Sequence, residues 1–183
     1  MAVVLVPLAE GFEDLEAITI TDLLRRAQIE VITAGLKPGP VRGSRGTVVV
    51  PDMTLDEALG HRFDMVILPG GQPGATNLEN DQRLRQLLLK MADAGKTVAA
   101  ICAAPKVLAA AGMLDGKRAT SFPGSVSADE FPNIQLSSDP VVEDGNIITS
   151  RGPGTAMDFA LKLIERLSGS EVSQHVEQAL HRP

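Results

Sequence analysis

The chain has 183 residues, of which 44% are hydrophobic and 22% are charged, and its formal net charge is −6. This size and balance fit a single domain, residues 1–183, with one sizeable core. The negative charge and the lack of Trp and Tyr argue against stable nucleic-acid binding, and no apolar run resembles a signal peptide or a membrane span.

Short apolar strands alternate with helical patterns along the chain. We expect strands at 2–7, 30–34, 47–50, 63–68, 97–102 and 119–121, a hairpin at 141–149, and helices at 13–27, 81–94, after 102, at 155–168 and at 170–180. Pro51 makes the 47–50 strand peripheral. The alternation predicts an α/β domain with a mostly parallel central sheet. In such a sheet, ligand sites lie beyond the carboxyl ends of the strands.

Cys102 is the only cysteine, and it stands where an apolar strand gives way to a helical pattern that begins near Pro105. Unpaired amides and the positive end of a helix dipole would favour the thiolate there, so we expect a lowered pKa. The alternative is a small buried hydrophobic residue. Because one cysteine cannot form an internal disulfide, the cytoplasm is the expected location.

The residues around Cys102 have the spacing of a nucleophile elbow, with Ala100 and Ala104 in the small-residue positions. Gly70 and Gly71 end the preceding strand pattern. Their amides, together with that of Ala103, could stabilise an oxyanion. The alternative is an ordinary glycine turn.

A histidine partner for Cys102 is not evident. His61 precedes a strand, at the amino end of the sheet, and His175 and His181 lie on the last helix. This distribution argues against a cysteine protease or glutaminase. The carboxylates that follow the first strand are better placed: Glu10, Glu13, Asp14 and Glu16.

Only one of these carboxylates is expected to face inward. We select Glu16, because apolar Ala17 and Ile18 follow it. Arg45 lies in a Gly-rich loop and is either a solvated charge or an anion clamp. Residues 150–155 resemble a phosphate loop but lack the lysine of a Walker motif, so we interpret them as a structural turn.

Taken together, these motifs resemble the ThiJ/PfpI superfamily, in its parkinsonism-associated deglycase branch. The resemblance covers nearly the whole chain, and its motifs lie at 11–16, 25–27, 44–46, 68–71, 99–105 and 149–155. It implies a flavodoxin-like three-layer sandwich and a homodimer.

The resemblance also implies roles for individual residues. Cys102 would be the nucleophile and oxidation site, and a protonated Glu16 would hydrogen-bond to its sulfur. Gly71 and Ala103 would supply oxyanion amides. Arg45, with Arg26 from the partner subunit, would line the pocket near the dimer interface.

The sequence departs from the family pattern at three positions. Phe122 stands where the best-known sensor of the family has a histidine, so a mechanism that needs this histidine is in doubt. Gly43 and Val50 stand where accessory cysteines would be, which argues against regulation by a second thiol.

The resemblance implies a cofactor-independent and metal-independent glyoxalase, which converts methylglyoxal or glyoxal to hydroxy acids. Its expected partners are therefore a small reactive aldehyde and a second copy of the chain. Deglycation of early glycation adducts would use the same adduct chemistry. The alternative from another class is an oxidative-stress sensor or chaperone-like protein, in which Cys102 becomes a sulfinic acid. Isonitrile hydration and amide hydrolysis are further alternatives.

Overall fold

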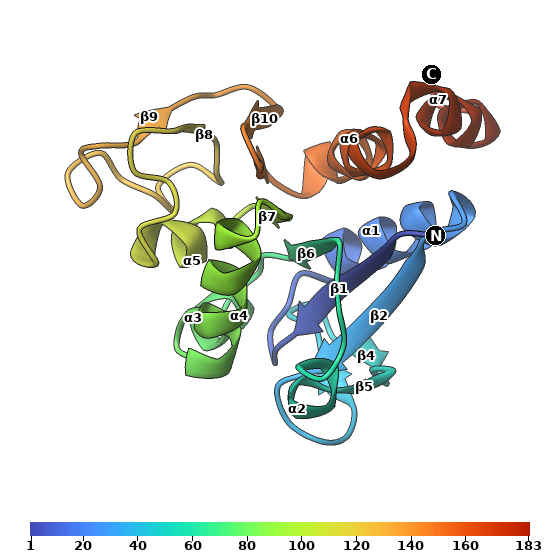
Figure 1. The fold of residues 1–183 in the computed structure, drawn as a ribbon, viewed down its shortest axis with the longest axis horizontal. Helices are drawn as coiled ribbons and strands as arrows, with labels where there is room; N and C mark the ends of the chain where they lie inside the picture. The colour runs from blue at the N-terminus through green and yellow to red at the C-terminus, as the bar shows by residue number, and fades with distance from the viewer.

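The computed structural model describes all residues from 1 to 183 (Figure 1). The elements are β1 (Val3–Leu8), α1 (Asp14–Arg26), β2 (Glu30–Gly35), β3 (Val41–Arg42), β4 (Val48–Val49), β5 (Met53–Thr54), α2 (Leu55–Ala58), β6 (Met65–Leu68), α3 (Gly74–Glu79), α4 (Gln82–Asp93), β7 (Thr97–Ile101), α5 (Pro105–Ala110), β8 (Arg118–Ala119), β9 (Gln135–Leu136), β10 (Val141–Asp144), β11 (Ile147–Ser150), a 3-10 turn (Pro153–Thr155), α6 (Ala156–Ser168) and α7 (Ser170–Ala179).

Seven strands form the central sheet in the order β10-β11-β7-β6-β1-β2-β5. All neighbouring strands are parallel except the β10–β11 hairpin. The chain proceeds from β1 to β2 and β5 on one side, and then to β6, β7 and β11 on the other. The strand order therefore reverses between β1 and β6, which is where α/β sheets usually bind ligands.

The sheet separates two hydrophobic cores, because successive side chains of a strand face opposite sides. On β1, Val4 and Val6 belong to the core that also contains residues of α1, α6 and α7. Leu5, between them, belongs to the core that contains residues of α2, α3, α4 and α5. Figure 1 shows these two groups of helices on opposite sides of the sheet. The predicted flavodoxin-like α/β sandwich with a mostly parallel sheet is confirmed.

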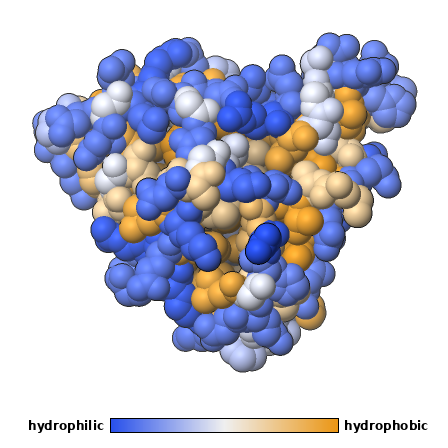
Figure 2. Space-filling view, in the orientation of Figure 1, coloured by the Kyte–Doolittle hydropathy of each residue, from blue (hydrophilic) through white to orange (hydrophobic).

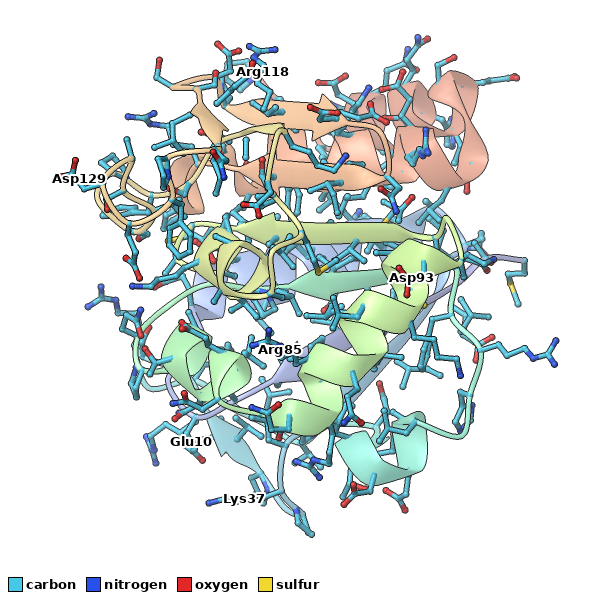
Figure 3. All side chains as sticks on the ribbon, turned by 60° about the vertical axis from the view of Figure 1, so that its left-hand side comes forward. Glu10, Lys37, Arg85, Asp93, Arg118 and Asp129 are labelled. Carbon is cyan, nitrogen blue, oxygen red and sulfur yellow. The ribbon has the colours of Figure 1, made fainter.

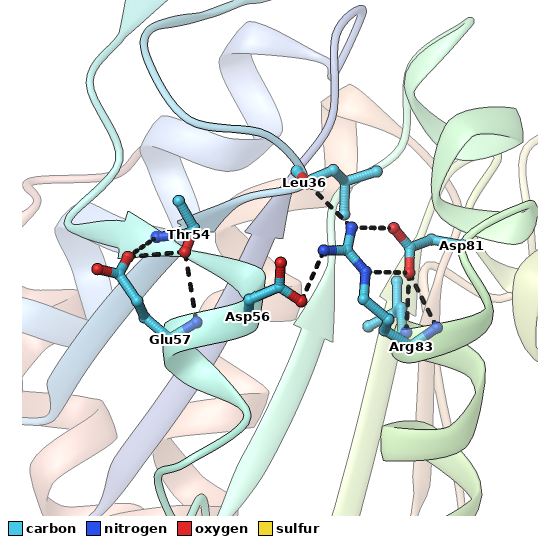
Figure 4. A network of polar contacts seen from close by, with 7 residues as sticks. Leu36, Thr54, Asp56, Glu57, Asp81 and Arg83 are labelled. Atoms are coloured by element: carbon cyan, nitrogen blue, oxygen red, sulfur yellow. Dashed lines mark hydrogen bonds and ion pairs between the residues drawn. The ribbon is translucent and has the colours of Figure 1, made fainter.

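Arg83 links three elements at the carboxyl end of β2 (Figure 4). Its guanidinium donates to the carbonyl of Leu36 at 2.9 Å, pairs with Asp56 in α2 at 2.9 Å, and bonds to Asp81. Asp81 also caps α4, since it accepts from the amides of Arg83 and Leu84. This network fixes the start of α4 against the sheet.

The sequence interpretation was wrong about the sheet edge beyond β2. Residues 47–50 contribute only β4, which pairs with β3 in a separate two-stranded sheet. The edge strand of the central sheet is β5, which the sequence did not predict. Asp52 fixes this edge, because its carboxylate accepts from both the amide and the hydroxyl of Thr33 on β2. Helices α2 and α3 and strands β3 and β9 were also missed.

The visible face in Figure 2 is mostly hydrophilic, with smaller apolar patches between the polar side chains. Charged side chains on several elements project from the surface (Figure 3), among them Glu10, Lys37, Arg85, Asp93, Arg118 and Asp129. None of the helices combines the length and hydrophobicity that crossing a bilayer requires.

Candidate active site

Cys102 occupies a sharp turn between β7, which ends at Ile101, and α5, which begins at Pro105. Its backbone φ angle is +65°, which residues other than glycine rarely adopt. Hydrogen bonds hold it there: its amide donates to the carbonyl of Ser150 at 3.0 Å, and its carbonyl accepts from the amide of Phe122 at 2.7 Å. The turn has the strained strand-to-helix form of a nucleophile elbow.

Gly70 and Gly71 bring the end of β6 against Cys102. A Cβ on Gly70 would lie 2.6 Å from the Cys102 Cβ and 2.9 Å from the Ala103 nitrogen, so only glycine fits. Gly71 has a φ of +88°, and a Cβ there would lie 2.3 Å from the Glu13 nitrogen. Burial raises the pKa of the Cys102 thiol, and the amides of Gly71 and Ala103, which are aimed at its sulfur, oppose that rise. The candidate oxyanion amides thus converge on Cys102.

Glu16 reaches the same point from the first turn of α1 and is fully buried. Its Oε2 accepts from the amide of Gly70 at 2.8 Å. Its Oε1 has no hydrogen-bond partner, and the neighbouring Cys102 thiol favours the charged form of the carboxyl group. Burial raises the pKa of Glu16 from 4.5 to about 7, although the bonds from Gly70 and Cys102 oppose this rise.

The predicted lowering of the Cys102 pKa is wrong. Burial, followed by the Glu16 charge and hydrogen bond, raises the pKa of the thiol from 9.0 to about 12. The amides of Gly71 and Ala103 oppose this rise but do not overcome it. Helix α5 has only six residues, so its dipole does little to lower the pKa of the thiol.

A proton on Glu16 changes this balance, because it removes the negative charge and lets the carboxyl donate to the sulfur. Cys102 and Glu16 therefore titrate as a pair that shares one proton. The first proton leaves the pair near the raised pKa of Glu16, about 7. Once the remaining proton resides on Glu16, Cys102 is the thiolate and accepts from the amides of Gly71 and Ala103.

We expect alkylation of Cys102 by iodoacetamide to rise with a midpoint near pH 7, because the pair loses its first proton there. The measurement is the alkylation rate across pH, followed by intact mass, and it reports one thiol because the chain has one cysteine. Glu16→Gln retains a donor to the sulfur and should stay reactive at neutral pH. If the rate rises only above pH 9 in the wild type, the proton stays on the sulfur and this account is wrong.

Two carboxylates in the first turn of α1 are buried, where the sequence interpretation expected one. Asp14 is 8% exposed and accepts from the amides of Arg45 at 2.8 Å and Thr47 at 2.7 Å. Burial raises its pKa, but hydrogen bonds from Thr47 and Arg45 outweigh that effect and lower it overall. Gly43 permits the contact, since a Cβ there would lie 2.4 Å from Asp14 Oδ2. Asp14 thereby fastens the 43–47 loop to the helix that carries Glu16.

The two predicted arginines are not part of this cluster within one protomer. Arg45 has a side chain that is 78% exposed, with its Nε 4.0 Å from Glu13 Oε2. Arg26 pairs with Asp22 in the last turn of α1. At 1.5 Å per helical residue, Arg26 lies about 15 Å along the helix from Glu16. Only a partner subunit could therefore bring an Arg26 to the site.

The histidines lie elsewhere. His61 is exposed and stacks on Phe63 before β6, and His175 lies on α7 beside a surface hollow that Arg26 also lines. No three His, Cys, Asp or Glu side chains are grouped so as to hold a metal ion. The acid/base chemistry available next to Cys102 is therefore that of Glu16.

Comparisons with known proteins identify the family of the chain. The model of the DJ-1/PfpI family matches residues 2–166. Protein dj-1beta of Drosophila melanogaster is 45% identical over 178 residues, which cover 96% of this chain and 95% of the relative. The crystal structure of Drosophila melanogaster DJ-1beta superposes with a TM-score of 0.93 at 43% identity, covering 98% of this chain and 97% of that one. Glutathione-independent glyoxalase DJR-1.2 of Caenorhabditis elegans is 36% identical over 170 residues, 93% of this chain and 90% of the relative.

Proposed function

Because this chain belongs to the DJ-1/PfpI family, we propose that it is a glyoxalase that needs no cofactor and converts methylglyoxal or glyoxal to the hydroxy acid. One observation carries the proposal: the fully buried Glu16 carboxyl, whose pKa burial raises to about 7, lies beside the only thiol of the chain, where the amides of Gly71 and Ala103 converge. A proton-accepting group with a pKa near neutrality is suited to general acid–base catalysis.

The proposed reaction begins when the Cys102 thiolate adds to the aldehyde carbon of methylglyoxal. A C–S bond forms, the carbonyl π bond breaks, and the resulting oxyanion takes the proton of Glu16, which gives a hemithioacetal. The amides of Gly71 and Ala103, which now face the sulfur, are close enough to stabilise this oxygen.

Glu16, now a carboxylate, would remove the proton from the former aldehyde carbon and deliver it to the neighbouring carbon. This isomerisation converts the hemithioacetal into a lactate thioester. Water then cleaves the thioester and regenerates the thiol, so that the sum is methylglyoxal plus water to lactate. Glu16 serves as the acid and the base in turn, and no histidine is required.

The name of DJR-1.2, a glutathione-independent glyoxalase, supports this reaction class for the family. Deglycation of early glycation adducts on proteins or nucleotides would begin at the same thiolate. Both reactions need the Cys102–Glu16 pair, so the site residues are the same for either substrate.

Purified protein is expected to release lactate from methylglyoxal, and Cys102→Ser is expected to reduce the rate to that of the uncatalysed reaction, because a serine hydroxyl in this site has no base strong enough to ionise it. The measurement is lactate yield over time for both proteins.

The second candidate, an oxidative-stress sensor or chaperone-like protein, predicts no lactate from the wild type. It predicts instead a gain of two oxygens on the Cys102 peptide after peroxide, where the unpaired Glu16 Oε1 and the two amides could hold the sulfinate.

We also propose a homodimer in which Arg26 of the partner subunit approaches the site. Apolar side chains exposed on α1 and β4 support an interface formed by these two elements. They are Leu15, Ile18 and Val48. Light scattering at micromolar concentration is expected to give twice the mass of the 19.3 kDa chain. A monomer would remove the role of Arg26.

A further inference from the structure

Phe122 is a large aromatic side chain that remains 48% exposed directly beside the candidate nucleophile. Its backbone is fixed on both sides: its amide donates to the Cys102 carbonyl at 2.7 Å, and its carbonyl accepts from the amide of Ser125 at 2.9 Å. The Ser121 hydroxyl donates to the same carbonyl at 3.0 Å. The backbone of Phe122 is therefore held next to that of Cys102 by hydrogen bonds that the proposed reaction does not use.

The ring lies on one particular side of Cys102. Its Cδ2 would be 3.4 Å from a Cβ on Gly152, so it rests against the chain that leaves β11. The amide of Cys102 bonds to Ser150 at the end of the same strand. Since β7 lies between β11 and β6 in the sheet, Phe122 stands on the β11 side and Gly71 on the β6 side.

The two sides of Cys102 therefore differ in chemistry. The β6 side presents backbone amides and the Glu16 carboxyl, which suit a carbonyl oxygen and its proton. The β11 side presents the apolar ring of Phe122, about half of which is exposed to solvent. A substrate whose oxygens face the amides would place its substituent toward the ring, and an apolar substituent would remove that ring surface from water.

We infer that Phe122 is a specificity-determining residue that favours 2-oxoaldehydes with an apolar or aromatic substituent. The inference rests on the proposed function and adds a substrate class to it. Phenylglyoxal should therefore be a better substrate than methylglyoxal, and glyoxal, which has no substituent, should be the poorest. The preference should appear mainly in KM, because the ring contacts the substituent and not the reacting carbons.

The test is the ratio of kcat/KM for phenylglyoxal to that for methylglyoxal, in wild type and Phe122→Ala. The loss of the ring should lower this ratio about tenfold, the range expected when an apolar pocket contact is removed. Phe122→Leu, which keeps an apolar side chain, should restore part of the ratio. Leu89→Ala is the matched control, since it removes an exposed apolar side chain from α4, a helix that contributes no residue to the candidate site, and should leave the ratio unchanged. An unchanged ratio in Phe122→Ala would overturn the inference.

A second readout does not depend on turnover. The alkylation rates of Cys102 by 2-bromoacetophenone and by iodoacetamide are compared in the same proteins by intact mass. Phe122→Ala should lower the rate for the aromatic reagent relative to iodoacetamide. If neither aldehyde is turned over but this relative rate falls, the glyoxalase proposal fails and the role of the ring stands. If lactate is formed but neither ratio moves, the ring has no such role.

Discussion

Glu16→Gln is expected to separate addition from turnover. The Gln amide can still donate to the sulfur and has nearly the same shape as the protonated carboxyl. Cys102 should therefore still form an adduct with methylglyoxal. Gln cannot move a proton between carbons, so lactate release should fall by at least about 100-fold, the typical share of a general acid–base group.

The measurements are the adduct mass and the lactate yield on the same samples. Glu30→Gln is the matched control, because Glu30 is an exposed carboxylate at the start of β2, whereas Cys102 lies at the carboxyl end of β7. Lactate production at the wild-type rate in Glu16→Gln would remove Glu16 as the base. An adduct that fails to form in Glu16→Gln would show that the carboxyl is needed to ionise the thiol, and not only to move protons.

Gly70→Ala is expected to abolish turnover and to destabilise the fold. The new Cβ would lie 2.6 Å from the Cys102 Cβ, 2.8 Å from the Ile101 oxygen and 2.9 Å from the Ala103 nitrogen. Two of these atoms belong to the backbone, so the strand ends themselves must separate. We expect a loss of about 1–3 kcal/mol in the free energy of unfolding and of about 100-fold in turnover, which a displacement of about 1 Å can cause.

Thermal or denaturant unfolding and the lactate assay on one preparation measure both effects. Gly60→Ala is the control, since a Cβ there meets nothing closer than the Glu57 oxygen at 3.4 Å. Wild-type activity in a stably folded Gly70→Ala protein would show that the close approach of β6 to Cys102 is not needed for the reaction.

The fold class could be predicted from sequence because its signals are local. Apolar runs of a few residues separated by helical periodicity specify the strands β1, β2, β6 and β7 whichever partners they acquire. The position of Cys102 is also a local property, since an apolar strand ends there and Pro105 opens the next helix. The two-residue strands β5 and β9 have no such signal, because their pairing partners, not their own residues, define them.

The buried carboxylates of the candidate site could be predicted only in part from the local sequence. The prediction that Glu16 faces inward is confirmed by its burial, but it was made partly for a reason that does not hold: Ile18 is 47% exposed and gives no indication of the buried face. Asp14 was considered but not expected to face inward, because its burial depends on the 43–47 loop, about thirty residues away, whose Arg45 and Thr47 amides donate to it. Neither fact is visible in the spacing of apolar residues along α1.

The sequence by itself determined the strand-and-helix pattern, the placement of the single thiol at a strand end, and the glycines beside it. Only the tertiary structure decided the protonation chemistry. Glu16 receives its one amide bond from Gly70, 54 residues away, and its raised pKa comes first from burial. A pKa depends on every charge, amide and water within a few ångströms, and folding brings those groups together from distant parts of the chain.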